Sequence, residues 1–240
     1  MQFIDSHIHL QDYKEKNVQQ IIKKMQSLGF TKIICASSHP SDWYKIAEIT
    51  TDNSDFIIPA FGIHPWYIDK TNPTWQNELQ DYLKQFSNAL IGECGLDNLK
   101  AENKDLQETF FIDQIQIAKK HNRSICIHSL KADNQIEKLL PEMPDKFMLH
   151  AFNGSIETLQ KILKFGGYIS ISDTIFKKKN HIDIIKQIPL DRLLSESDGP
   201  YMSDFEKIND LITHIAKIKN IDKIALIEQI YYNFKEFCRV

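Results

Sequence analysis

The sequence predicts an α/β fold, a single TIM-like (β/α)8 barrel over residues 1–240. Eight short, nearly continuous apolar runs alternate with helix-length amphipathic segments along the whole chain, which is typical of parallel strands buried on both faces. No Gly/Ser linker or change in composition divides the chain, and its 240 residues are close to the roughly 250 of such barrels. A doubly wound open sheet is the alternative, but no GxGxxG or GxxxxGK[ST] motif follows the first run.

The expected strands are the runs enriched in Ile, Val, Phe and small residues. They cover residues 2–8, 32–37, 57–63, 89–94, 124–129, 147–152, 167–172 and 192–197.

The expected helices lie between these runs and show apolar side chains at helical spacing. Examples are residues 18–29, 105–121, 134–143 and 155–167. Gly29 can end the first of these, and Ser155 can cap the start of the last. Residues 211–238 read as one or two amphipathic helices that close the outer ring.

Composition excludes several classes of protein. A net charge of −3 gives no overall electrostatic reason to bind nucleic acid or an anionic membrane, so any phosphate recognition must be local. The four cysteines are far apart without a CxxC motif, as expected for reduced thiols in an intracellular protein. The N-terminal run lacks the features of a signal peptide, and no apolar stretch is long enough to span a membrane. We therefore expect a cytoplasmic protein with no membrane partner, and a monomer because no heptad or apolar patch is recognisable.

Histidines and carboxylates gather at the ends of the expected strands, where barrel enzymes carry their chemistry. His7 and His9 share one face of the first strand, with Asp5 on it too. The seven candidates are His7, His9, His64, Glu93, His128, His150 and Asp198. Each alone could be a loop residue or a buried group satisfied by backbone amides. Together at the ends of apolar strands they would be costly to bury without a compensating cation.

The donor types narrow the choice of cation. Imidazole and carboxylate without thiolate suit Mg, Mn, Fe or Zn rather than Cu(I) or an iron–sulfur cluster. One catalytic ion usually needs about three protein ligands. Seven candidates therefore fit two divalent metal ions (Mg, Mn or Zn), bridged by a carboxylate and a hydroxide.

Six motifs in order resemble those of the TatD-related metal-dependent hydrolases, in the amidohydrolase superfamily. They read FIDSHIHL, FGIHPW, IGECGLD, CIHS, LHAFNGS and IPLDRLLSESDGPYM, and they span about residues 3–202. The resemblance implies a TIM-like barrel, a dinuclear metal site and magnesium- or zinc-dependent deoxyribonuclease activity.

The resemblance also implies roles for individual residues. By motif, His7 and His9 are similar to ligands of the first metal, Glu93 to the bridging carboxylate, and His128 and His150 to ligands of the second metal. Asp198 is similar to the last-strand aspartate that binds the first metal and orients the attacking water. His64 is similar to a histidine near the scissile phosphate, so Asp198, Glu93 and His64 form the expected catalytic set.

The chain departs from the family pattern in its loops. Leu130 and Lys131 stand where an arginine is frequent, Trp66 where a second histidine is frequent, and Asn98 where an aromatic is frequent. The usual Gly/Arg/Lys and Asn-Glu-Pro segment after Asp198 is missing. These positions belong to loops that would contact substrate, so the sequence supports hydrolytic chemistry better than it supports DNA as the substrate.

Candidate substrate contacts lie on the same loops. Lys177, Lys178 and Lys179 could attract a phosphate backbone, although three loop lysines can equally be a solvated face. Trp66 and its aromatic neighbours on the loop side, Tyr67, Phe152 and Tyr201, could stack on bases or pack as a lid.

These observations lead to one expected function and two alternatives. We expect a two-metal-activated water to hydrolyse a phosphodiester in DNA or RNA ends or in a small molecule. The first alternative is a metal-dependent amide or ester hydrolase, because the same activated water can attack a carbonyl. The second is an inactive barrel that acts as a binding module.

Overall fold

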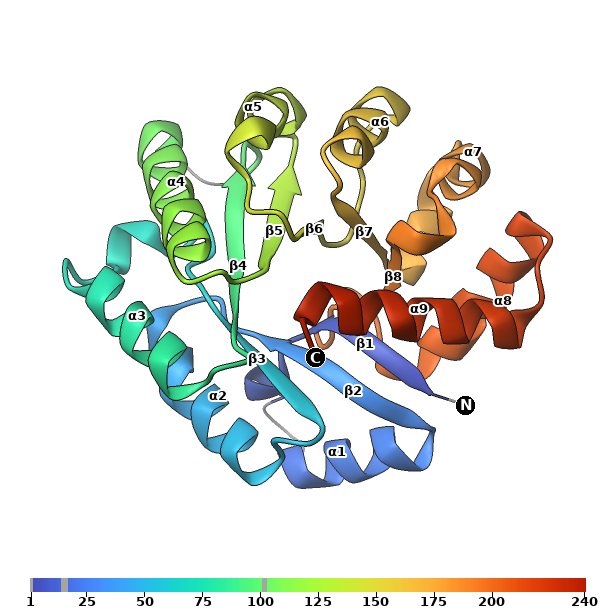
Figure 1. Ribbon diagram of the computed structural model, residues 1–240, viewed down its shortest axis with the longest axis horizontal. Coiled ribbons are helices and arrows are strands. Elements are labelled where there is room, and N and C mark those ends of the chain that lie inside the picture. The colour runs from blue at the N-terminus through green and yellow to red at the C-terminus, as the bar shows by residue number, and fades with distance from the viewer. Residues whose placement is uncertain (1, 14–16, 101–102) are drawn as a thin grey trace.

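Eight parallel strands form one sheet in which each strand pairs with the next along the chain (Figure 1). The computed structural model describes residues 2–13, 17–100 and 103–240. The strands are β1 (Phe3–Ile8), β2 (Phe30–Ala36), β3 (Ile57–Phe61), β4 (Leu90–Asp97), β5 (Ile125–Leu130), β6 (Phe147–Leu149), β7 (Tyr168–Ile171) and β8 (Leu193–Ser195). All eight expected strands are present, and the predicted (β/α)8 architecture is confirmed.

Helices follow the strands and surround the sheet (Figure 1). They are α1 (Val18–Ser27), α2 (Pro40–Asp52), α3 (Trp75–Gln85), α4 (Lys104–Lys120), α5 (Asp133–Leu139), α6 (Ile156–Lys164), α7 (His181–Gln187), α8 (Ile208–Lys219) and α9 (Lys223–Cys238). Ser155 caps α6 through Thr158 N, as predicted. The last amphipathic segment forms two helices, because Asn220 adopts a left-handed conformation and Asp222 caps a new helix.

The barrel closes between the first and last strands. Beyond the end of β8, Asp198 N donates to His7 O at 2.9 Å, and His9 N donates to Gly199 O at 2.8 Å. Deeper in the barrel, Ser6 Oγ donates to Ser195 O at 3.0 Å. These bonds join the two chain segments that carry His7, His9 and Asp198, so closure of the barrel itself brings these side chains together.

Helix α9 covers the opposite end of the barrel. Asn233 Nδ2 donates to Leu193 O at 2.8 Å at the start of β8, and Ser124 Oγ donates to Phe237 O at 2.5 Å just before β5. The rings of Phe237 and Tyr168, the first residue of β7, lie 5.4 Å apart. The N-terminal ends of these strands are therefore closed by α9, while the C-terminal ends lead into the βα loops.

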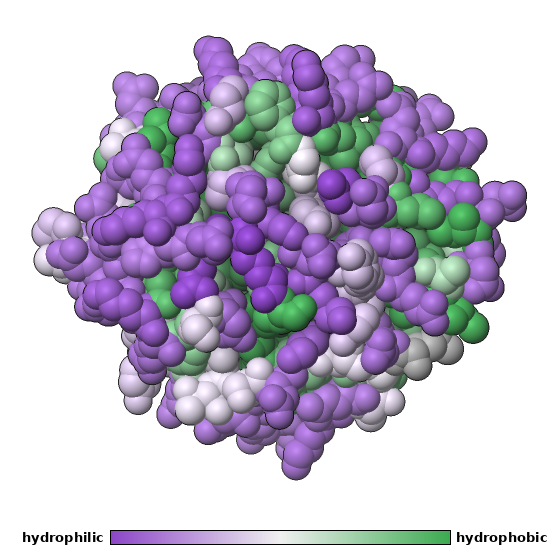
Figure 2. All heavy atoms as spheres, in the orientation of Figure 1, coloured by the Kyte–Doolittle hydropathy of each residue, from purple (hydrophilic) through white to green (hydrophobic). Residues whose placement is uncertain are grey.

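The outer surface is mostly hydrophilic, and the cysteines are unpaired, as the composition predicts. Figure 2 shows one face covered mostly by hydrophilic residues, with hydrophobic atoms in separate groups. Cys35, Cys94, Cys126 and Cys238 are free and buried, as expected for small apolar side chains in a core. Among the described helices, none has the length and apolarity to cross a membrane.

Candidate metal centre

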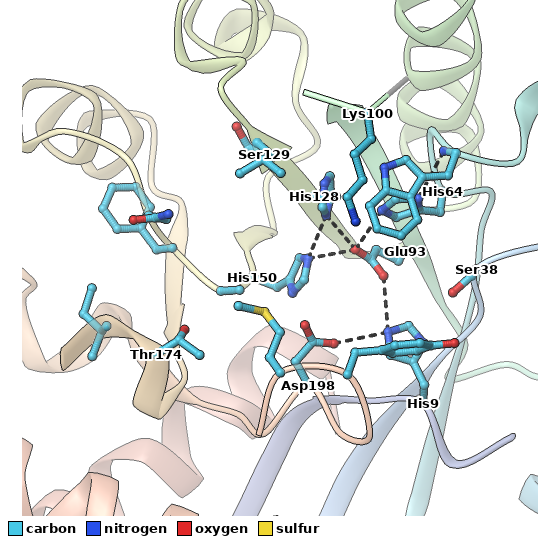
Figure 3. A pocket seen from close by; sticks show the side chains of 18 of the residues that line it. His9, Ser38, His64, Glu93, Lys100, His128, Ser129, His150, Thr174 and Asp198 are labelled. Atoms are coloured by element: carbon cyan, nitrogen blue, oxygen red, sulfur yellow. Dashed lines mark hydrogen bonds and ion pairs between the residues drawn. The ribbon is translucent and has the colours of Figure 1, made fainter. Parts of the chain in front are cut away.

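The predicted histidines and carboxylates meet at the C-terminal end of the barrel. Six of the seven line a cavity of about 560 Å³ (Figure 3), and the seventh, His7, is fully buried. His7, Glu93 and His128 lie within β1, β4 and β5, and the other four follow β1, β3, β6 and β8. Residues spread over almost the whole sequence therefore converge because parallel strands end at the same edge.

Glu93 lies at the middle of this group and faces two sets of histidines. Its Oε2 is 3.4 Å from His7 Nε2 and 3.3 Å from His9 Nε2. Its Oε1 is 2.9 Å from His128 Nδ1 and 2.8 Å from His150 Nε2. The side chain of Glu93 is only 5% exposed, so each carboxylate oxygen is held among imidazole nitrogens.

Asp198 completes the first set. Its Oδ1 lies 3.3 Å from His9 Nε2 and 3.9 Å from His7 Nε2. The backbone of Asp198 is left-handed, with φ of 52°, a conformation that costs a non-glycine residue about 1–2 kcal/mol. The hydrogen bond from Asp198 N to His7 O fixes this turn, so closure of the barrel aims the carboxylate at the histidines.

His64 lies next to Glu93 and His128, within the candidate metal centre itself. Its Nε2 is 3.6 Å from Glu93 Oε1, and its ring centroid is 4.4 Å from that of His128. The donor atoms of His64, Glu93 and His128 all lie within 4.8 Å of one another. His64 can therefore serve as a third imidazole around Glu93 Oε1.

These separations fit ligands that share a divalent cation. Two donor atoms, each about 2.1 Å from an ion, lie about 3.0–3.4 Å apart at octahedral or tetrahedral angles. His7 Nε2 and His9 Nε2 are 3.2 Å apart, and both face Glu93 Oε2. A single hydrogen cannot bond to all three atoms, whereas one cation can. The residues present therefore fit a metal ion.

Burial and mutual attraction shift the pKa values of the centre. Burial alone would raise the pKa of Glu93, but the surrounding histidines, above all His150 by its charge and its hydrogen bond, hold it well below the usual range. Burial lowers the pKa of His64 to about 3. Glu93 is therefore a carboxylate and His64 a neutral imidazole at neutral pH, the protonation states in which both bind metals.

Two further carboxylates, which were not identified from the sequence, face the ring nitrogens of His128 and His150 that point away from Glu93. Asp97 Oδ2 lies 3.4 Å from His128 Nε2, and Glu196 Oε1 lies 3.5 Å from His150 Nδ1. Carboxylates in this position fix the tautomer and direction of a metal-binding imidazole. Asp97 could have been found by alternation along β4, because residues 93 and 97 share a face. The same spacing of two relates Glu196 to Asp198.

Asp5 does not join the histidines. Its carboxylate accepts from Ser197 Oγ at 2.5 Å and from Ser197 N at 3.0 Å. Burial raises the pKa of Asp5 to about 8. Asp5, expected on the same face of the first strand as His7 and His9, instead ties β1 to the segment before Asp198.

The three loop lysines differ in position. Lys177 is exposed and lines the cavity. Lys178 also lines it, but its Nζ donates to Asn153 O at 2.6 Å and to Gly154 O at 2.8 Å. Lys179 is exposed and lies outside the cavity lining. The sequence could not distinguish them, because the distinction depends on which backbone carbonyls each side chain reaches.

The aromatic residues of the loops line the cavity. Trp66, Tyr67, Phe152 and Tyr201 are all part of its wall. The indole of Trp66 is not free, because its Nε1 donates to Asp97 Oδ2 at 2.6 Å.

The fold and the centre define a class, the parallel barrels that hold divalent metal among histidines and carboxylates at the C-terminal ends of their strands. Residues 4–239 match the family model described as TatD related DNase, and the chain belongs to that family. It is 26% identical to human "Deoxyribonuclease TATDN3", over 94% of this chain and 90% of that protein. It is 31% identical to "Uncharacterized metal-dependent hydrolase BU355" of Buchnera aphidicola, over 85% of this chain and 83% of that protein.

A solved structure confirms the fold. The crystal structure of the TatD homologue YjjV from Escherichia coli superposes with a TM-score of 0.91 at 20% identity. The match covers 99% of this chain and 98% of that one. The barrel described above is therefore shared over the whole length of both chains.

Proposed function

We propose that this protein is a divalent-metal-dependent hydrolase that cleaves phosphodiesters, most readily at the ends of DNA or RNA. The observation that carries the proposal is the position of Glu93, whose two oxygens face separate groups of histidines. A carboxylate in this arrangement is suited to bridging two ions. The membership of this chain in the TatD related DNase family supports the same chemistry.

The residues would hold two ions as two sets that share Glu93. His7, His9 and Asp198 form the first set, and His128 and His150 form the second, with His64 within reach of it. When bound, the ions supply an activated water and stabilise charge on the phosphoryl oxygens. The mixed nitrogen and oxygen donors suit Mg, Mn or Zn.

Asp198 is the proposed base for the attacking water. His9 lowers the pKa of Asp198 against the effect of burial, so its carboxylate is ionised and can accept a hydrogen bond and a proton. The water oxygen bonds to phosphorus, the bond from phosphorus to the leaving oxygen breaks, and the water's proton passes to Asp198. The leaving oxygen takes up a proton, returned by Asp198 or supplied by solvent, so the products are a phosphomonoester and an alcohol, without a covalent enzyme intermediate.

Two features of the cavity support a nucleic-acid end as substrate. Its volume of about 560 Å³ is within the range of small-ligand pockets, about 300–1,000 Å³, which suits an end of a strand better than its middle. Lys177 and aromatic side chains line it, as phosphates and bases would require. The name of the human relative, a deoxyribonuclease, agrees with this substrate.

We also propose that the chain acts as one domain and as a monomer in the cytoplasm. The continuous eight-stranded sheet supports one domain, and the four free cysteines support a reducing compartment. Gel filtration with light scattering tests the oligomeric state directly.

Turnover of 3′-labelled single-stranded DNA tests the proposed activity. The protein is stripped of metal, and Mg, Mn or Zn is added back, with His128→Ala as the paired variant. We expect nucleotide release that depends on the ion and is lost in the variant. If wild type binds two ions but leaves DNA intact with each metal, the proposal fails, and amide and ester substrates should be assayed instead.

A further inference from the structure

One buried carboxylate connects the candidate metal centre to the wall of the cavity. Asp97 Oδ2 accepts from Trp66 Nε1 at 2.6 Å and lies 3.4 Å from His128 Nε2. Asp97 Oδ1 accepts from Leu99 N at 2.8 Å and from Lys100 N at 2.9 Å. The indole of Trp66 and the backbone that carries Lys100 are therefore fixed by the same group that faces a histidine of the centre.

Lys100 is the residue that this arrangement presents to the cavity. Its side chain is exposed and lines the cavity, and its Nζ lies 4.0 Å from the centroid of the Trp66 ring. In Figure 3 it extends from the loop after β4 into the cavity beside His128. A cation over an indole face is held by about 0.5–1 kcal/mol at an exposed site, so the amino group is guided but remains free to donate to a ligand.

A second lysine lines the cavity from a different segment of the chain. Lys177 follows β7, three strands further round the barrel than β4, and it also lines the cavity. Figure 3 shows Thr174, from the same segment, across the cavity from Lys100. Lys178 does not offer an equivalent cation, because Asn153 O and Gly154 O already accept from its Nζ. Positive charge is thus presented to the cavity from two segments, one after β4 and one after β7, above a centre where Glu93 and Asp198 are negative.

We propose that Lys100 and Lys177 each bind a substrate phosphate, and that the preferred substrate carries at least one phosphate besides the one that reacts. A single phosphodiester seated at the metal centre offers one phosphate to two amino groups that come from segments three strands apart in the barrel. A short oligonucleotide, with its phosphates spaced along the backbone, can engage both. This inference deepens the proposed function and rests on it for substrate turnover, but not for binding of anions.

Binding provides the first test. The probe is a tetrathymidylate with hydrolysis-resistant phosphorothioate linkages, and a methylphosphonate tetrathymidylate is its uncharged counterpart. Each of Lys100→Met and Lys177→Met should weaken binding of the charged probe about three- to fivefold. Each should also reduce the slope of log affinity against log salt by about 0.7, the value for one contact to a single strand. Binding of the uncharged probe should not change.

Two control variants separate a local contact from a change in net charge or in packing. Lys104→Met removes the same charge from an exposed position at the start of α4, outside the cavity lining, and should behave as wild type. Lys100→Arg keeps the cation and should retain most of the affinity. If Lys100→Met and Lys177→Met match Lys104→Met with both probes, the two lysines do not bind phosphate and the inference is wrong.

Turnover provides the second test and separates this inference from the proposed function. Wild type should favour tetrathymidylate over the dinucleotide dTpdT by about tenfold in kcat/KM, the product of two contacts worth about three- to fivefold each. The Lys100→Met/Lys177→Met double variant should lose that preference mainly through KM. Equal preference in wild type and double variant overturns the inference while phosphodiester hydrolysis stands. Lysine-dependent binding of the charged probe without any turnover would support the two-lysine site and refute the proposed hydrolysis.

Discussion

His7 and His150 stack face to face, with ring centroids 4.0 Å apart and ring planes 17° apart. They come from β1 and from the end of β6, and both rings turn an Nε2 toward Glu93. Two protonated imidazoles this close would repel each other, and burial together with His150 lowers the pKa of His7. The stack therefore favours a neutral His7, which is the form that binds a divalent cation.

Removal of divalent metal should lower the thermal stability of the protein. A ligand at one hundred times its Kd stabilises the native state by about 2.7 kcal/mol, which for a chain of this size shifts Tm by about 5–10 °C. Calorimetry of chelated and metal-reloaded protein measures the shift. Glu93→Gln is the control, because it keeps the side-chain volume but weakens both ligand sets. An equal shift in Glu93→Gln would show that the stabilising ion binds elsewhere.

Asp97→Asn should weaken metal binding without unfolding the protein. Removing a carboxylate behind a metal-binding histidine typically costs about 10- to 100-fold in affinity, and Asp97 lies behind His128. Isothermal titration of the metal-free variant with Zn measures the loss, and circular dichroism checks the fold. Asp105→Asn, at an exposed position in the first turn of α4, is the matched control. Unchanged affinity in Asp97→Asn would show that His128 needs no such support.

Gly95→Ala should destabilise the barrel by about 3 kcal/mol or more. Gly95 has a φ of +144°, and a Cβ at this position would lie 2.0 Å from His128 O on the neighbouring strand. Gly166→Ala is the comparison, because Gly166 also has a positive φ but a Cβ there would meet no atom within 4 Å. That variant should cost only about 1–2 kcal/mol. Urea unfolding measures both, and equal losses would mean that the close approach of β4 and β5 is not tight.

The cysteine thiols should be unreactive in the native protein. Burial raises the pKa of Cys35 to about 12 and that of Cys238 well above its usual value, and the thiolate is the reactive form. At pH 8, Ellman's reagent should modify less than one thiol per native chain and all four after denaturation. Rapid modification of the folded protein would contradict the burial of these side chains.

Much of the centre follows from one rule applied to the sequence. Apolar strands followed by His, Glu or Asp place those side chains at one end of a parallel barrel, and this was enough to bring together residues as distant as His7 and Asp198. The rule does not predict how each side chain is oriented at that end of the barrel. Glu196 supports His150, and Lys178 bonds to loop carbonyls, only because of the way that the loops turn after each strand.

The strand lengths show the same limit. The predicted runs 147–152 and 192–197 end as strands at Leu149 and Ser195. Both stop where the backbone leaves the ladder to carry the next polar residues, and Ala151 has a φ of +42° there. The side chains of His150, Phe152, Glu196 and Ser197 beyond these ends are still buried, so burial does not mark where the pairing ends.

Helix α9 divides the molecule into an end that maintains the fold and an end that is free to vary. Its contacts with the beginnings of β5, β7 and β8 hold the barrel together far from the cavity. Loop substitutions around the cavity, such as those at Trp66 or Lys177, therefore need not loosen these contacts. This separation makes the scaffold evolvable, because substitutions in the loops can change its substrate range while the barrel keeps its stability.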